Sequence, residues 1–441
     1  MRKLILLGCL SYFVIGLAHV VAGALLEPVM ANYDLSYGAA GQWITNQFLG
    51  FLLGVLAAPA ITSRIGRRSG LVLALGFLTA AEAIYSMLPP WDVILVAAPV
   101  AGFGFGMTEA VVGALILDVF SRGKASVMGW LEVAFGAGAL AMPALAALLI
   151  RDGIWMMSFP VLTALAGISM LLWMTLSFGS ADEAVAYAPR AAAPADASPD
   201  ARATAAAARE SDDPVAAPGL DGPAAVPAAG GSLAAAESGA SAAGRGWLGY
   251  GRGAWPLLAV GMAFFFLYVG LEMVFANYLP SIMTNGSGVG DAEASAVLSL
   301  FWATMVAGRL LIGFATRAAG YRVYLLGSVV STLAALVLLA SAGTLTWTLV
   351  LVALAGFCMA GIFAVALIYV NERLPGMTDR TTSLLVACGG LGGAIFPKLG
   401  GWLFDLYGWQ RLLQLTAVMG AVLLVLLLVL LAMRGRRTAE A

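Results

Sequence analysis

The chain has 441 residues, of which 61% are hydrophobic and only 11% are charged, and its formal net charge is -1. A soluble domain carries roughly 45–50% apolar and about 25% charged residues, because its surface needs polar groups. The composition therefore excludes an ordinary soluble protein and predicts a membrane protein, while the near-neutral charge indicates no nucleic-acid partner. The three cysteines lie in apolar runs without a metal-binding or redox spacing, so we expect small buried side chains and no cofactor.

The hydropathy pattern predicts a series of membrane-spanning helices. A bilayer core of ~30 Å needs about 20 apolar helical residues. The first apolar stretch runs to about Met30, which is too long for a signal peptide and predicts a retained helix. In chain order, the predicted spans are residues 4–31, 39–62, 69–88, 92–117, 124–150, 154–178, 254–283, 292–316, 321–343, 346–371, 380–406 and 409–433. These twelve spans predict an all-α membrane protein in contact with lipid.

Lys and Arg are divided unevenly between the two sets of connecting loops. One set, together with the tails, holds Arg2, Lys3, Arg64, Arg67, Arg68, Arg122, Lys124, Arg317, Arg322, Arg373, Arg380, Arg434, Arg436 and Arg437. The opposite loops hold only Arg151 and Arg411. Cytoplasmic loops are enriched in these residues, so we expect a multi-pass protein of the cell membrane with both termini in the cytoplasm.

Residues 179–253 interrupt the apolar pattern. From Ala191 to Gly246 they are rich in Ala, Pro, Gly, Ser and Asp and cannot bury a core. We interpret 179–253 as a disordered cytoplasmic linker that tethers a six-helix bundle at 1–178 to a second bundle at 254–433. A cytoplasmic tail at 434–441 follows the second bundle.

The two predicted bundles are related by an internal repeat. An offset of 254 residues aligns Gly54 with Gly308 and Gly66 with Gly320. The same offset aligns Ala101-Gly102-Phe103 with Ala355-Gly356-Phe357, and Gly136, Gly138 and Pro143 with Gly390, Gly392 and Pro397. Parallel repeats about an axis along the membrane normal are the plan of the major facilitator fold, in which substrate binds at the repeat interface near mid-membrane. We therefore predict this fold, with two pseudo-symmetric bundles.

The loop after the second span combines basic residues with glycine. It reads Pro59-Ala60-Ile61-Thr62-Ser63-Arg64-Ile65-Gly66-Arg67-Arg68 and resembles the major facilitator loop signature Gly-x-x-x-Asp-Arg-x-Gly-Arg-Arg. Ser63 stands at the acid position, and Arg317 stands there in the second copy. We expect a cytoplasmic gate whose basic side chains bond helix ends when it closes. Its predicted residues are Arg64, Gly66, Arg67, Arg68, Arg317, Gly320 and Arg322.

Ionisable side chains well inside the predicted spans point to function, because a charge in the bilayer core is costly. They are Glu82, Glu109, Glu132, Glu272 and His19, the only histidine, and Lys398 lies beside Pro397 in the span at 380–406.

Glu109 shares one helical face with Gly102, Gly106 and Gly113, and its repeat position holds Phe363. An acid placed in one half only favours Glu109 as a proton carrier, assisted by Glu132 or His19. A structural polar contact is the alternative for each.

Polar and aromatic side chains gather in the span that begins at 254. Tyr268 and Glu272 are four residues apart and share a face, and Asn277 follows them. Aromatic faces beside hydrogen-bonding groups suit a sugar, which has apolar ring faces and a rim of hydroxyls. The predicted substrate contacts are Asn46, Gln47, Tyr268, Glu272, Asn277 and Trp302, with helix packing as the alternative for each aromatic residue.

Several segments resemble the bacterial glucose/mannose:proton symporters in the fucose-permease-like branch of the major facilitators. The resemblance is carried by residues 104–113, 131–140, 268–272, 275–283 and 308–314, and by His19 followed by Gly23. It implies that Glu109 matches a helix-4 glutamate that takes part in proton coupling. The fucose permease also has a helix-1 aspartate in its sugar site, and the sequence Val21-Ala22-Gly23-Ala24 has no acid there, which argues against fucose.

These observations favour a monomeric secondary transporter that takes up a hexose such as glucose or mannose with protons, by alternating access. An exporter of a drug-like or metabolite solute is the alternative, and it would have a roomy, mostly apolar cavity with no cluster of amide groups. A transport-derived sensor that signals through the linker is the third reading. Sodium coupling stays open. No metal cluster, nucleophile triad or phosphate loop is visible in the sequence, so we do not expect an enzyme.

Overall fold

The computed structural model describes residues 2–120, 124–179, 182, 254–374 and 378–433, which form helices joined by turns, without a strand. The helices of the first half are α1 (Arg2–Ala24), α2 (Leu26–Tyr33), α3 (Tyr37–Ile65), α4 (Arg67–Ser86), α5 (Trp91–Val119), α6 (Lys124–Arg151), the short 3₁₀ helix η1 (Trp155–Met157) and α7 (Ser158–Thr175). Those of the second half are α10 (Trp255–Ser287), α11 (Asp291–Leu339), α12 (Leu345–Met359), α13 (Ile362–Asn371) and α14 (Thr378–Ala432). Apart from Gly179 and Asp182, the predicted linker lies outside the described residues, as does the predicted tail.

Ten helical segments among the described residues are long and apolar enough to cross a membrane. Two of them contain a break, because the backbone is not helical at Gly320 in α11 and at Gly408 in α14. Each break divides one segment into two crossings, so ten segments with two breaks make twelve crossings. The twelve predicted spans and the all-α fold are confirmed.

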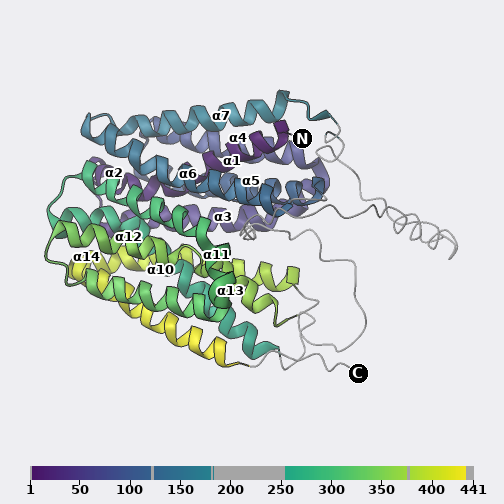
Figure 1. Cartoon of the computed structure of the whole chain (residues 1–441). Helices are drawn as coiled ribbons and strands as arrows, with labels where there is room; N and C mark the ends of the chain where they lie inside the picture. Colours follow the sequence, from purple (N-terminus) through teal and green to yellow (C-terminus); the bar gives the residue numbers. More distant parts are fainter. Residues whose placement is uncertain (1, 121–123, 180–181, 183–253, 375–377, 434–441) are drawn as a thin grey trace, which may run out of the picture.

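The two halves lie side by side, with the helices of the first half (purple to blue in Figure 1) along one flank and those of the second half (teal to yellow) along the other. α1 begins and α14 ends at the same end of the molecule (Figure 1). We call this the tail end. The opposite end, where α3 begins at Tyr37 and where Asp405 of α14 lies, is the far end.

The internal repeat appears as a repeat of helix contacts. α3 crosses α5 so closely that a Cβ atom at Gly54 would lie 2.3 Å from the carbonyl oxygen of Phe103. At an offset of 254 residues, a Cβ atom at Gly308 would lie 2.7 Å from the carbonyl oxygen of Phe357. Helices in a membrane pack by such close approach at small residues, because lipid supplies little hydrophobic drive for association. The glycines that align in sequence therefore build the same crossing twice.

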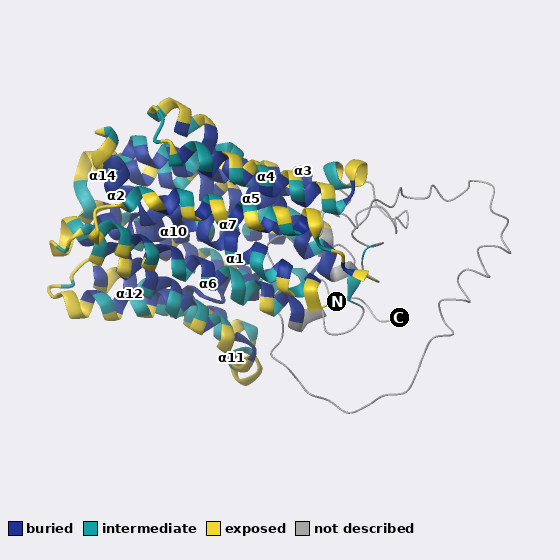
Figure 2. Ribbon diagram, turned by 90° about the horizontal axis from the view of Figure 1, so that it is seen from above, coloured by how far each residue is buried: buried dark blue, intermediate teal, exposed yellow. Residues whose placement is uncertain are grey.

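The outward faces of the helices are apolar. Phe314 is 71% exposed, and Trp402 and Val425 are also exposed. Buried residues fill the interior and the exposed positions lie on its outside (Figure 2). A surface of large apolar side chains on spanning helices suits contact with lipid and not with water.

Two crossings of the membrane are interrupted. α1 and α2 are separated at Leu25, and α12 and α13 are separated at Ala360 and Gly361. The Ser295 hydroxyl donates to the carbonyl oxygen of Ala24 at 2.5 Å, and the Tyr268 hydroxyl donates to that of Met359 at 2.8 Å. Backbone groups freed by a break need such partners where water is scarce.

The halves meet along two seams, α3 with α14 and α6 with α11. Side-chain hydroxyls cross both seams: Thr45 donates to the carbonyl oxygen of Ala394 at 2.6 Å, and Ser299 donates to that of Leu140 at 3.0 Å. Nearer the tail end, the pair Glu132 and Arg309 remains 24% and 29% exposed. The halves are thus closed at the far end and looser toward the tail end.

Close packing at glycine makes a stability prediction. A Cβ atom at Gly102 would lie 1.8 Å from the carbonyl oxygen of Gln47, whereas one at Gly327 would meet nothing within 4 Å. We expect Gly102→Ala to lower the free energy of unfolding by about 1–3 kcal/mol through overpacking. Gly327→Ala should leave it unchanged or raise it by up to ~1 kcal/mol, since alanine favours a helix. Thermal unfolding of the detergent-solubilised variants measures both, and equal midpoints would contradict the close crossing.

Candidate functional site

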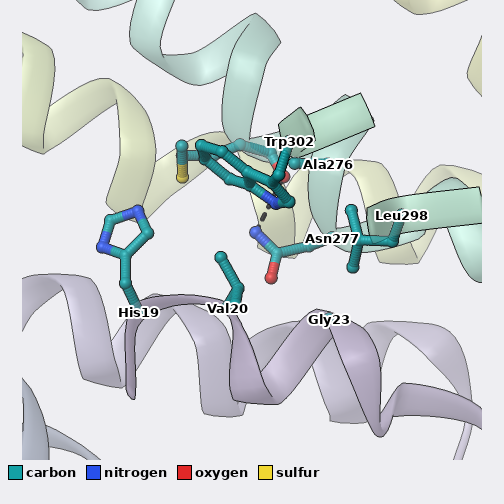
Figure 3. Close-up of a pocket in the computed structure, with 8 residues that line it drawn as sticks. His19, Val20, Gly23, Ala276, Asn277, Leu298 and Trp302 are labelled. Carbon is teal, nitrogen blue, oxygen red and sulfur yellow. Dashed lines mark hydrogen bonds between the residues drawn. The ribbon is translucent and has the colours of Figure 1, made fainter. Parts of the chain in front are cut away.

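A small pocket lies between the two halves, where α1 meets α10 and α11 (Figure 3). It is lined by His19, Val20, Gly23, Met273, Ala276, Asn277, Leu298 and Trp302. Its free volume is about 10 Å³, roughly the space of one water molecule, so the pocket is nearly closed in this conformation. No Asp, Glu, Lys or Arg is among these lining residues. The lining therefore offers no counter-ion to a charged ligand.

The pocket straddles the axis that relates the two repeats. His19 and Met273 are 254 residues apart, as are Gly23 and Asn277, and all four line the pocket. Equivalent positions of two repeats meet only on the axis between them. The pocket thus lies at the repeat interface, where this architecture places its substrate site.

Asn277 approaches α1 at a glycine. A Cβ atom at Gly23 would lie 2.9 Å from both the Cα and the Oδ1 atoms of Asn277. The Asn277 amide nitrogen donates to the carbonyl oxygen of Met273 at 2.9 Å, as the dashed line in Figure 3 marks. Because this bond fixes the nitrogen on α10, the amide oxygen lies toward α1 and the pocket.

Trp302 forms one wall of the pocket. Its side chain is 2% exposed, and its indole nitrogen has no hydrogen-bond partner among the described residues. A buried donor without a partner loses the free energy of a hydrogen bond to water. A ligand acceptor in the pocket would restore that bond.

His19 lies within a ring of aromatic side chains. Its imidazole is 5.2 Å from the ring of Phe48, 5.8 Å from Phe105, 5.5 Å from Phe135 and 6.4 Å from Trp302, each approached edge-on. Its Nδ1 atom has no partner among the described residues. The predicted proton assistant therefore lies at the pocket wall among rings, with no carboxylate among these ring contacts.

A cluster of ionisable groups lies beside the pocket, on its tail-end side. The guanidinium of Arg309 on α11 is 3.9 Å from the carboxylate of Glu132 on α6, so this ion pair joins the two halves. Arg309 also lies within electrostatic range of Glu109, Glu272 and His19. The structure thus gathers three of the four predicted intramembrane acids around one cation.

The two other acids of the cluster are almost fully buried, each 8% exposed. Glu109 lies on α5, and its backbone carbonyl accepts a hydrogen bond from the Tyr12 hydroxyl at 3.1 Å. Glu272 lies on α10 within hydrogen-bonding reach of the Tyr268 hydroxyl. Glu82, by contrast, lies on α4 with both carboxylate oxygens unpartnered among the described residues, outside this cluster.

Arg309 is the functional candidate that the sequence analysis missed. It lies inside the predicted span at 292–316, where no functional residue other than Trp302 was predicted. The signal was available: the repeat position of Arg309 is Val55, so this charge, like those of Glu109 and Glu132, occurs in one half only.

Four of the predicted substrate contacts are not among the pocket-lining residues. The amide of Gln47 donates to the carbonyl oxygen of Ala18 on α1 at 3.0 Å, and that of Asn46 donates to Leu95 on α5 at 2.9 Å. Tyr268 bonds the helix break at Met359, and Glu272 belongs to the charged cluster. These side chains hold the helices that carry the pocket, whereas Asn277 and Trp302 line it.

The predicted gate loops have the backbone that their glycines allow. Gly66 and Gly320 have φ angles of 83° and 75°, where glycine is favoured. Arg68 stays within its own half and donates to the carbonyl oxygens of Trp173, Met174 and Leu176 at 2.7–2.9 Å, which caps the end of α7. Arg67 is half-buried, and Arg64, Arg317 and Arg322 are exposed.

Comparison with known proteins agrees with this architecture. A family model described as Major Facilitator Superfamily matches residues 8–284 and 258–441, which together span almost the whole chain. The chain belongs to the major facilitator superfamily. Among curated proteins, it is 28% identical over 404 residues to the glucose/mannose transporter GlcP of Bacillus subtilis, covering 91% of this chain and 88% of that protein. It is 32% identical over 149 residues to the sodium-dependent glucose transporter 1A of Mus musculus, covering 33% of this chain and 34% of that protein.

Solved structures agree on the fold. The nucleoside transporter NupG superimposes with a TM-score of 0.70 at 11% identity, covering 97% of this chain and 99% of that one. The human organic anion transporter MFSD10 superimposes with a TM-score of 0.60 at 16% identity, covering 97% of this chain and 99% of that one. The chain is therefore a multi-pass membrane transporter and not an enzyme, and the predicted resemblance to glucose/mannose transporters is confirmed.

The Arg68 cap makes a prediction about the gate loop. Three hydrogen bonds from one guanidinium to helix-end carbonyls hold the start of α4 to the end of α7. We expect Arg68→Gln to lower the free energy of unfolding by about 1–3 kcal/mol, because the carbonyls lose a charged donor. Arg64→Gln, at an exposed position of the same loop, serves as the control and should change it little. Equal thermal midpoints for the two variants would show that the cap contributes no stability.

Proposed function

We propose that this transporter takes up a neutral hexose of the glucose/mannose type together with protons, by alternating access. The observation that carries the proposal is the uncharged pocket on the repeat axis. Its wall presents the amide of Asn277 and the indole N–H of Trp302, a donor that none of the described residues partners. The similarity to a glucose/mannose transporter over 91% of the chain supports the substrate class.

The chemistry of the pocket matches a pyranose. The indole face of Trp302 complements an apolar sugar face, and its N–H can donate to a ring or hydroxyl oxygen. The Asn277 amide oxygen can accept from a hydroxyl. A charged solute would lack a counter-ion among the lining residues, and burying an unpaired charge is costly.

The charged cluster supports proton coupling. One guanidinium balances one carboxylate, yet Glu109, Glu132 and Glu272 all lie within electrostatic range of Arg309. Excess charge within a membrane is costly, so protons stabilise the cluster. The Glu132–Arg309 ion pair joins the halves. A proton on Glu132 would weaken this pair, whereas a proton on Glu109 or Glu272 would leave Arg309 to Glu132 and strengthen it. Either change alters a contact between the halves, which must change as access alternates.

The exporter alternative was expected to show a roomy, mostly apolar cavity with no cluster of amide groups. The pocket is not roomy, and Asn277 is the one amide among its lining residues, so the direction of transport is decided by the uptake assays below. The sensor reading depends on the linker, which lies outside the described residues. One relative is a sodium-dependent glucose transporter. The test below therefore includes a sodium gradient.

The Trp302 N–H makes a binding prediction. Trp302→Phe keeps an aromatic face but removes the donor, so we expect glucose and mannose to bind about 2- to 12-fold more weakly, the effect of one lost hydrogen bond. Asn277→Ala should weaken binding by about 1–3 kcal/mol if it leaves a sugar hydroxyl unsatisfied. Trp130→Phe is the matched control, because Trp130 is 62% exposed on the outside of α6. The affinity of each variant is measured by equilibrium binding of labelled hexose in detergent. Unchanged affinity in both pocket variants would show that the sugar binds elsewhere.

Glu109 makes the coupling prediction. Glu109→Gln keeps the shape of the side chain but cannot exchange a proton, so we expect uphill hexose uptake under a pH gradient to be lost while sugar counterflow persists. Glu82→Gln is the matched control: Glu82 is also buried, but it lies outside the cluster, and both activities should persist.

Both activities are measured in the same proteoliposomes, with a pH gradient, a sodium gradient or neither. Uphill uptake by Glu109→Gln at the normal rate would exclude Glu109 as the carrier. Uphill uptake by the unaltered protein under a sodium gradient alone would show that sodium, and not the proton, is the coupling ion.

A further inference from the structure

At the far end, an acid of one half binds the first turn of a helix of the other half. Asp405 on α14 accepts hydrogen bonds from the backbone N–H groups of Tyr37 and Gly38, at 2.8 and 2.7 Å. These are the first two residues of α3, and the first N–H groups of a helix have no partner within it. The Ser36 side chain accepts only from the N–H of Ala39, at 3.2 Å. Asp405 therefore completes the N-terminal cap of α3 from across the seam.

The same turn also receives a cation from α14. The Lys398 ammonium donates to the carbonyl oxygen of Gly38 at 2.7 Å. Lys398 and Asp405 are seven residues apart, so they lie on one face of α14. Asp405 accepts from the N–H group of Gly38, and Lys398 donates to the carbonyl oxygen of the same residue. The first turn of α3 is thus held by backbone bonds from two charged side chains of the opposite half.

Glycines allow this approach. A Cβ atom at Gly38 would lie 2.9 Å from Oδ2 of Asp405, and one at Gly41 would lie 2.5 Å from the hydroxyl oxygen of Tyr278. On the opposite helix, a Cβ atom at Gly401 would lie 2.3 Å from the carbonyl oxygen of Tyr37. Larger side chains at these positions would keep α3 and α14 apart. Glycine therefore allows the two halves to close against each other at the far end.

Tyr37 fills the gap between the halves. Its ring lies 3.8 Å from that of Phe404, and its hydroxyl donates to Glu27 at 3.1 Å and accepts from Asn285 at 2.8 Å. The Tyr278 hydroxyl donates to the carbonyl oxygen of Pro397 at 2.8 Å. Since Tyr278 follows Asn277 in the chain, the far-end contact is one residue away from the wall of the pocket.

We propose that Asp405, with Lys398, forms the releasable gate of the far end: the Asp405 carboxylate caps α3 when that end is closed and leaves it when that end opens. All of the bonded groups are charged side chains or backbone groups at a helix start, which water can satisfy once the halves part. The gate therefore holds firmly in the closed state without trapping the protein there. It concerns the movement of the transporter and requires no particular substrate.

The test measures the accessibility of two cysteine reporters in nanodiscs, after Cys9, Cys358 and Cys388 have been replaced by alanine. The first reporter is Ser295→Cys, because Ser295 is 1% exposed and bonds the opposite half at Ala24. The second is Leu52→Cys, because Leu52 faces Gly390 across the α3–α14 seam, toward the tail end. The rate of labelling by a maleimide is measured at each reporter. Opening of the far end with closure of the tail end changes the two rates in opposite directions.

We expect Asp405→Ala to raise the labelling rate at the Ser295→Cys reporter about 2- to 30-fold, the range for loss of a helix cap, and to lower the rate at the Leu52→Cys reporter. Lys398→Met should act in the same direction. Asp152→Ala is the control, because Asp152 is exposed and pairs with the adjacent Arg151. An unchanged rate at the Ser295→Cys reporter in both gate variants overturns the proposal. A rise at both reporters indicates general loosening and overturns it as well.

Discussion

Inside a bilayer, a polar group finds no water, so its hydrogen-bond partner must come from the protein. This constraint accounts for much of the described structure. Hydroxyls of Ser295 and Tyr268 satisfy the carbonyls at the helix breaks, and the amide of Gln47 satisfies a carbonyl of α1. Where the constraint is not met, the exception is informative. The indole N–H of Trp302 has no partner within the described part of the chain and faces the pocket, which is the place where a ligand can supply one.

The two halves share a framework, and the proposed function depends on where they differ. Glycine crossings such as Gly54 on Phe103 and Gly308 on Phe357 recur in both, because each half must pack its helices in the same way. The charges do not recur: Glu132 and Arg309 have Val386 and Val55 at their repeat positions. Helix packing can be the same in both halves. Coupling of proton movement to sugar movement, by contrast, needs charged groups that occur in one half only. The pocket shows the same contrast at one pair of repeat positions: Gly23 in the first half leaves the space that the side chain of Asn277 in the second half occupies.

The far-end gate and the charged cluster use different chemistry for different environments. Asp405 and Lys398 bond backbone groups at a helix start, where water can replace them when the seam opens. Glu132 and Arg309 lie deeper along the spans and bond each other across the second seam. An unpaired charge within a span is costly, so a proton that neutralises an acid of this pair eases its separation. Between them lies the neutral pocket, in contact with both through α10.

The sequence alone determined the membrane class, the twelve spans, the repeat and the family, because apolar length and glycine spacing are properties of a single stretch of chain. It also singled out Glu109, Glu132 and Glu272, since an acid in an apolar span is visible without neighbours. It did not separate Asn277, which lines the pocket, from Asn46 and Gln47, whose amides bond α5 and α1. Nor did it show that Arg309 gathers those acids, or that Asp405 caps a helix that begins 368 residues earlier. Those assignments depend on which helices touch, and only the tertiary structure decides that, because a side chain's partner across a seam leaves no trace in its own stretch of sequence.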